Sequence, residues 1–244
     1  MNRSEEPIEG HMRRTVLWLA VGIFVGFTLA GCGGRAVQAS GLDELVGYWQ
    51  VPGQGPLQVR EVDGRFAVGG SFGQPRPVLQ VSGRLLLFKG RVISQAQSVQ
   101  GGELAWEQGR AVLLYFDPVS GAVRQKVSLT RLTKSGYAKA AVTYANYMTK
   151  VWSYSLATLV ARWAKQHGGT PPAPAAMIPG SSFGRFVIKQ GEYGSRIWPS
   201  NPFTGKPMRA GTDPGDFTYS SSGSSFKLIA HLSGGQNYVA QRPR

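Results

Sequence analysis

The chain has 244 residues, of which 42% are hydrophobic and 11% aromatic, and this content excludes a wholly disordered protein. Its formal net charge is +14, which favours anionic partners. The lysines and arginines are spread singly, without a basic run or a stacking motif, so we expect an anionic envelope polymer or lipid and no nucleic acid. The single cysteine excludes an internal disulfide and a cysteine-based zinc site.

Residues 1–31 are predicted to be an export signal. Arg13 and Arg14 precede a largely apolar run that ends at Ala30, and this run is shorter than the roughly 20 residues of a membrane-spanning helix. The run ends in LAGC (29–32), which resembles the lipobox of bacterial lipoproteins. The resemblance implies a covalent lipid on Cys32 and a membrane-anchored protein outside the cytoplasm. The alternative is an incidental cysteine in a plain membrane anchor. Residues 32–44 would then be a tether.

Residues 45–134 are predicted to form a β-rich domain. Short apolar alternations predict eight or nine antiparallel strands, arranged as a small barrel or sandwich. The expected turns are Asp63-Gly64, Ser82-Gly83, Gly101-Gly102, Gln108-Gly109 and Ser120-Gly121. The segment Gly47-Tyr48-Trp49 resembles the first strand of lipocalin-like barrels. Trp49 is expected to fill the barrel floor, and a ligand cavity inside the barrel remains the alternative.

Residues 135–244 are predicted to form a helix packed on a small sheet. Apolar residues recur at three- and four-residue steps from Tyr137 to Gln166, which predicts one long amphipathic helix whose aromatic stripe is a packing face. Gly168-Gly169 would end it. Strands are expected at 183–189, 216–221 and 225–232. The whole chain is therefore expected to be α+β.

The segments WPSNPFTGKPM (198–208), GTDPGDFTY (211–219) and FKLIAHL (226–232) follow the helix in that order. Together with the helix they resemble the C-terminal part of G-type pseudopilins of type II secretion. The resemblance covers roughly Tyr137 to Leu232 and implies a pilin-like head. Pilins carry an apolar helix directly ahead of this part, whereas here the β-rich domain and the lipid anchor take its place. We therefore expect a pilin-like module in a lipoprotein.

The proline-rich loop in this region is expected to be stiff. Its prolines fix φ, and the side chain of Asn201 or Asp213, each of which precedes a proline, can cap a turn. Such a loop would present Trp198, Phe203 and Lys206 outward as a docking surface. Some secretion pseudopilins bind calcium here, so Asp213 and Asp216 are a possible weak metal site, and turn capping is the preferred explanation for them.

The sequence offers little for catalysis, because no metal-binding, acyl-transfer or hydrolase motif is found around its histidines and serines. We therefore expect a lipid-anchored envelope protein without enzymatic activity, which docks a protein or an anionic polymer. One alternative is a lipocalin-like carrier of a small hydrophobic ligand. Another is an accessory component of a type II secretion or type IV pilus system. No cofactor is expected beyond the lipid.

Overall fold

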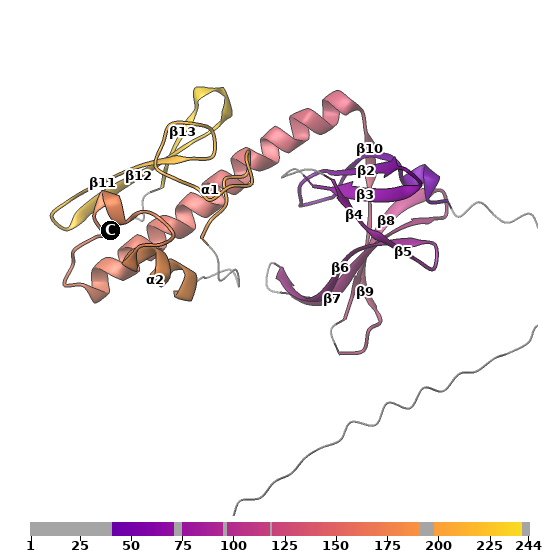
Figure 1. Cartoon of the computed structure of the whole chain (residues 1–244), viewed down its shortest axis with the longest axis horizontal. Helices are drawn as coiled ribbons and strands as arrows, with labels where there is room; N and C mark the ends of the chain where they lie inside the picture. Colours follow the sequence, from indigo (N-terminus) through magenta and orange to yellow (C-terminus); the bar gives the residue numbers. More distant parts are fainter. Residues whose placement is uncertain (1–40, 71–74, 95–96, 118, 191–197, 241–244) are drawn as a thin grey trace, which may run out of the picture. The chain divides into compact units, whose positions relative to one another are not determined.

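The structure is a computed structural model that describes residues 41–70, 75–94, 97–117, 119–190 and 198–240. Residues 37–244 belong to one compact unit. The protein is α+β, with antiparallel sheets and two α-helices among the described residues (Figure 1).

The described residues between 47 and 132 form ten strands in two five-stranded sheets. The order is β10-β1-β2-β3-β4 in one sheet and β5-β6-β7-β8-β9 in the other. The strands are β1 (Gly47–Gln50), β2 (Leu57–Val62), β3 (Arg65–Gly69), β4 (Arg76–Pro77), β5 (Leu79–Val81), β6 (Arg84–Ser94), β7 (Gln97–Glu107), β8 (Arg110–Phe116), β9 (Val123–Ser128) and β10 (Thr130–Leu132).

Three of the five predicted turns are tight two-residue hairpins. Both residues have positive φ in Asp63-Gly64 (51° and 71°), Ser82-Gly83 (49° and 73°) and Gln108-Gly109 (51° and 75°). Positive φ at both central residues is the backbone of a type I′ turn, which matches the twist of paired strands. The turn expected at Gly101-Gly102 is wrong, because both glycines lie inside β7 and pair with β6.

The chain crosses from one sheet to the other at two positions. Val78 separates β4 from β5, and Leu129 separates β9 from β10. Strands that bend between sheets form the corners of packed-sheet structures. Residues of both sheets share one hydrophobic core, which includes Trp49 at 3% exposure, as expected for a packing residue. No closed barrel is found among the described strands, so that form of the prediction is wrong.

Helix α1 (Lys134–Gln166) confirms the predicted long helix and starts three residues earlier than expected. Thr133 caps its first turn, since the Thr133 hydroxyl accepts a hydrogen bond from the amide of Gly136 at 3.0 Å. Gly168 and Gly169, with φ of 64° and 87°, follow its end. The amide of Gly169 donates to the carbonyl of Ala164, which is the usual glycine-dependent termination.

The strand predicted at residues 183–189 is wrong, because this segment forms helix α2 (Ser182–Gln190). The Ser181 hydroxyl accepts a hydrogen bond from the Gly184 amide at 2.8 Å and so caps the helix. Phe183 and Val187, four residues apart, are both buried. The segment has the aromatic and β-branched content of a strand, but its buried positions repeat at helical spacing.

The last sheet has the order β11-β12-β13 and packs against α1 (Figure 1). Its strands are β11 (Phe217–Ser222), β12 (Ser225–His231) and β13 (Asn237–Ala240). Strands β11 and β12 confirm two of the three strands predicted after the helix. A second hydrophobic core joins this sheet to α1, α2 and the loop that starts at Trp198, with Leu156, Phe183, Met208 and Phe217 at its centre.

Candidate functional site

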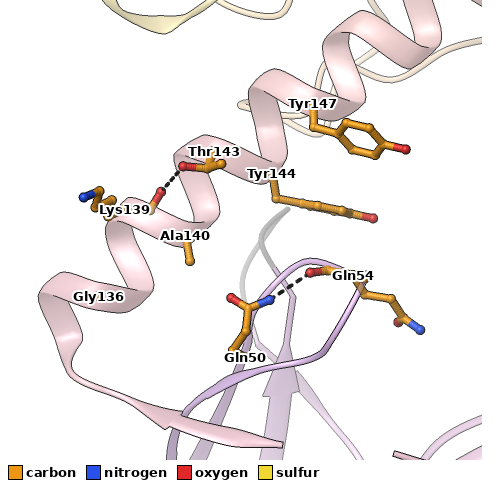
Figure 2. A pocket seen from close by; sticks show the side chains of 9 residues that line it. Gln50, Gln54, Gly136, Lys139, Ala140, Thr143, Tyr144 and Tyr147 are labelled. Atoms are coloured by element: carbon orange, nitrogen blue, oxygen red, sulfur yellow. Dashed lines mark hydrogen bonds between the residues drawn. The ribbon is translucent and has the colours of Figure 1, made fainter.

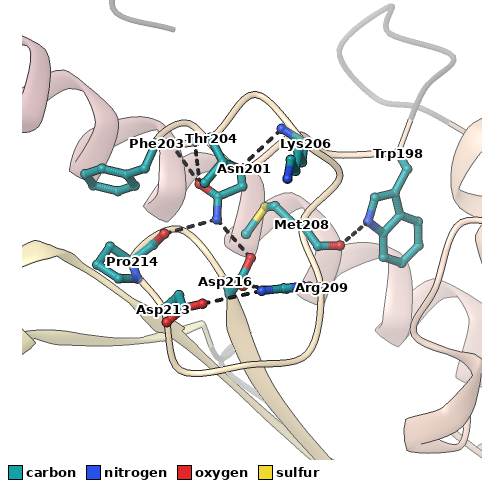
Figure 3. Close-up of polar contacts among 10 residues, drawn as sticks. All are labelled: Trp198, Asn201, Phe203, Thr204, Lys206, Met208, Arg209, Asp213, Pro214 and Asp216. Atoms are coloured by element: carbon teal, nitrogen blue, oxygen red, sulfur yellow. Dashed lines mark hydrogen bonds and ion pairs between the residues drawn. The ribbon is translucent and has the colours of Figure 1, made fainter. Parts of the chain in front are cut away.

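The loop from Trp198 to Asp216 is held by one buried side chain, Asn201, which is 2% exposed. The Asn201 side-chain oxygen accepts hydrogen bonds from the amides of Phe203 (2.8 Å) and Thr204 (3.3 Å). Its side-chain nitrogen donates to the carbonyl of Pro214 (3.0 Å) and to Asp216 Oδ1 (2.9 Å), as Figure 3 shows. The predicted turn cap at Asn201 is confirmed, and the same side chain also joins the two ends of the loop.

A guanidinium group lies between the two aspartates expected as a weak metal site. Arg209 Nε is 3.2 Å from Asp216 Oδ2, and Arg209 Nη2 is 3.4 Å from Asp213 Oδ2 (Figure 3). The hydrogen bond to Asp216 raises the pKa of Arg209. Since Asp216 also accepts a hydrogen bond from Asn201, these carboxylates form an internal ion-pair network and do not fit a calcium site of six to eight oxygens.

The three residues expected to point outward from the loop differ in exposure. Trp198 is only 5% exposed, and its indole N–H donates to the carbonyl of Met208 at 2.8 Å, so the outward placement of Trp198 is wrong. The indole packs edge-on against Phe183 of α2 because a large apolar ring is more stable in the core. Phe203 is half-buried and Lys206 is exposed. The loop can therefore offer one lysine and part of one ring to a partner.

A row of three polar side chains crosses the exposed face of the last sheet. Thr218 Oγ1 lies 2.8 Å from His231 Nε2, and His231 Nδ1 lies 2.9 Å from Asn237 Oδ1. A hydroxyl that contacts an imidazole, which in turn contacts an amide, resembles the arrangement of nucleophile, base and orienting group in enzymes with an activated nucleophile. The three residues come from adjacent antiparallel strands, where such pairs also stabilise the sheet. We interpret the row as a cross-strand contact.

A groove of about 650 Å³ runs between the first turns of α1 and the loop that joins β1 to β2 (Figure 2). Tyr144 and Tyr147 lie on its helix side, with their ring centroids 6.2 Å apart. Burial raises the pKa of Tyr144, whereas Tyr147 is 53% exposed. Lys139 and Gln50 add a cation and an amide to the lining. The groove therefore combines ring surfaces with polar groups, as ligand sites do.

The groove opens onto a part of the chain that has no acidic residue. Residues 118–191 contain ten lysines and arginines and no aspartate or glutamate. Six of the seven basic residues of α1 and α2 are exposed, namely Lys134, Lys139, Lys150, Lys165, Arg185 and Lys189. Outside the two helices, some basic side chains lie beside carboxylates, as Arg84 does with Glu103 at 3.3 Å. The helices therefore carry a one-signed surface that attracts anions.

The sequence predicts that Tyr144 belongs to a packing stripe and that the positive charge is spread evenly over the surface. The missing acidic residues between positions 118 and 191 are visible in the sequence and were the signal that could have located the cationic surface. The groove itself could not be found in this way, because Gln50 and Tyr144 are far apart in the chain and meet only in the folded structure.

Cys32 and the predicted export signal lie outside the described residues. Within the described ranges, no helix has both the length and the hydropathy needed to cross a bilayer. The described residues also contain no cluster of three or more His, Cys, Asp or Glu side chains that could hold a metal ion. No family model matches the chain, and neither the curated proteins nor the solved structures include a significant match to it.

Proposed function

We propose that the protein is a lipid-anchored, extracytoplasmic envelope protein without enzymatic activity that binds an anionic polymer. The observation that carries the proposal is the cationic surface of α1 and α2, because the two helices hold seven of the ten basic residues between positions 118 and 191 and no acidic residue. The proposed anchor is a lipid on Cys32, supported by the LAGC motif and the apolar run before it. Such an anchor would keep the cationic surface close to the polymers of the envelope.

The groove beside α1 adds a reason to prefer a polymer to a simple ion. Exposed lysines attract phosphate or carboxylate groups over a Debye length of about 8 Å at physiological salt, without selecting any one unit. The rings of Tyr144 and Tyr147 would contact the uncharged part of a repeating unit, and Lys139 beside them would pair with its charge. Electrostatic attraction and local contact would then act on the same chain.

The proposal is tested by titrating residues 37–244 with poly(glycerol phosphate), with neutral dextran of similar length, and with vesicles with and without anionic lipid. We expect binding to poly(glycerol phosphate) that weakens as salt is added, and none to dextran. Equal binding to dextran, or binding only to anionic vesicles, would contradict the proposal of an anionic polymer as the partner.

The arrangement of α1 and the last sheet favours a second candidate, an accessory component of a type II secretion or type IV pilus system. A 33-residue helix packs on an antiparallel three-stranded sheet, and a proline-rich loop fixed by Asn201 lies beside both. The pilin-like resemblance implies a long helix, this loop and two strands in that order, and α2, which lies between α1 and the loop, is not part of that pattern. In this candidate, Phe203 and Lys206 would dock a pilin-like partner protein.

The second candidate predicts a specific cross-link. A photoreactive amino acid placed at Phe203 in cells should capture a pilin or secretion component, while the same group at Val62, an exposed position on β2, should not. Capture of no such component from cells that express the secretion system would exclude this candidate and leave the polymer proposal standing.

A further inference from the structure

Residues of both sheets of the β-rich part line a second, partly open pocket, separate from the cationic surface. Its volume is about 410 Å³, within the range of roughly 300–1,000 Å³ that is typical of small-molecule sites. Val51 and Leu113, which are 1% and 3% exposed, form its floor. Its walls come from both sheets and consist of Leu57, Val68, Val78 and Leu87. The part of the lining that these six residues form is therefore apolar.

The polar atoms of this pocket come from three residues, namely Gln54, Arg76 and Tyr115. Gln54 Nε2 donates to the hydroxyl of Tyr115 at 2.7 Å, which fixes both side chains. Burial raises the pKa of Tyr115, so its hydroxyl stays neutral at physiological pH. Arg76 is exposed, and none of the ion pairs among the described residues involves it. The pocket thus has an apolar floor and a single positive charge at its exposed side.

We propose that this pocket binds a small amphiphilic anion, with an aromatic or short aliphatic body between the sheets and a carboxylate or sulfonate paired with Arg76. The apolar floor favours the body because water leaves both surfaces. A guanidinium group pairs with a planar or tetrahedral anion through two parallel hydrogen bonds. The pocket is too small for a two-chain lipid, so the ligand is distinct from the proposed anchor.

This inference does not rest on the proposed polymer binding, because the two sites share only Gln54. Two observations point to a ligand: an apolar interior built from both sheets, and an unpaired cation at the exposed side of the same pocket.

The experiment uses two fluorescent probes with the same ring system, the anionic 1-anilinonaphthalene-8-sulfonate and the neutral N-phenyl-1-naphthylamine. Residues 37–244 are suitable because they form one compact unit that contains both cores. Arg76→Gln should weaken the sulfonate about tenfold and leave the neutral probe unchanged, since one charge-assisted contact is lost. Arg110→Gln removes an exposed charge outside the pocket and should change neither affinity.

Val68→Phe should fill the pocket and weaken both probes, whereas Val62→Phe, at an exposed position on the adjacent strand, should weaken neither. Far-UV circular dichroism checks that each variant is folded. The proposal is overturned if the wild-type protein binds neither probe, if Arg76→Gln and Arg110→Gln weaken the sulfonate equally, or if a folded Val68→Phe protein binds the neutral probe as the wild type does.

Discussion

Asn201 fixes the proline-rich loop through four side-chain hydrogen bonds, although the sequence predicts Trp198, Phe203 and Lys206 as its docking residues. One amide side chain satisfies two backbone amides, one carbonyl and one carboxylate in a site that is 2% exposed. Removing a buried partner leaves the other polar groups without hydrogen bonds, and this costs more than the bond itself contributes. The loop therefore depends on Asn201 as much as on its prolines.

Asn201→Ala is expected to lower the free energy of unfolding by about 2–4 kcal/mol, because the buried Asp216 and the part-buried backbone amides of Phe203 and Thr204 lose a partner. Urea unfolding followed by circular dichroism measures the change. Asn237→Ala is the matched control, since this asparagine is exposed and should cost less than about 1 kcal/mol. Equal stability of Asn201→Ala and the wild type would show that the prolines alone fix the loop.

Tyr219 predicts a pH dependence at the alkaline end. Burial raises the pKa of Tyr219 from 10.0 to about 12, and its hydroxyl donates to the carbonyl of Pro172 at 2.9 Å. Because folding raises this pKa, the neutral hydroxyl contributes to the free energy of unfolding. The contribution is fully present below pH 10 and is lost as the pH rises through 12. The contribution is on the order of 2 kcal/mol. Stability measured from pH 9 to pH 12 should fall more steeply in the wild type than in Tyr219→Phe.

Two residues show what local sequence could and could not predict. The turn cap at Asn201 follows from an asparagine before a proline, which is a local rule, and it is confirmed. The burial of Trp198 was missed because it depends on α2, whose Phe183 provides the ring that the indole contacts. Because the sequence pattern predicts a strand at residues 183–189, it does not predict the helix face with Phe183 that Trp198 covers.

At the scale of elements, α2 begins at an unusually close backbone contact. A Cβ atom on Gly184 would lie 2.1 Å from the carbonyl oxygen of Ile178 and 2.3 Å from that of Pro179. Only a glycine allows the first turn of α2 to approach this preceding segment. The contact explains why a residue with poor helix propensity stands in the first turn of a short helix.

Gly184→Ala is expected to destabilise the protein by about 2–3 kcal/mol, although alanine normally favours a helix by about 1 kcal/mol over glycine. The reason is the clash with two carbonyl oxygens that belong to the backbone and cannot rotate away. The thermal midpoint measures the effect. Gly180→Ala serves as the control because its Cβ would meet nothing within 4 Å. A stabilised Gly184→Ala variant would mean that α2 is not seated in this way.

The elements differ in how far their sequences predict them. Helix α1 and three type I′ hairpins follow from local signals, namely helical spacing and residues that tolerate positive φ. The division of the β-rich strands into two sheets depends on bends at Val78 and Leu129. Neither is a residue type that is typical of turns, so the sequence does not mark these bends. Such bends decide whether the strands close into a barrel or separate into two sheets. The alternation of apolar residues along each strand therefore does not predict which of the two forms.

At the scale of the whole molecule, the lipid anchor is the part of the proposal that depends only on sequence. Cys32→Ala is expected to abolish incorporation of radiolabelled palmitate and to release the protein from the membrane fraction. Labelling of the wild type followed by membrane fractionation measures both. Val37→Ala, a nearby change outside the lipobox, should leave labelling unchanged. Equal labelling of the wild type and Cys32→Ala would contradict the anchor.

The central claim is that the position of the charges on α1, rather than the net charge, holds an anionic polymer. The measurement compares the affinity of two triple variants for poly(glycerol phosphate). The first variant changes Lys139, Lys150 and Lys165 to Gln. The second changes Arg65, Arg110 and Lys227 to Gln and so has the same net charge as the first. All six side chains are exposed. At about 0.5 kcal/mol per exposed charge, the first variant should bind about tenfold more weakly, and the second should bind nearly as well as the wild type. Equal loss in both variants would contradict the account.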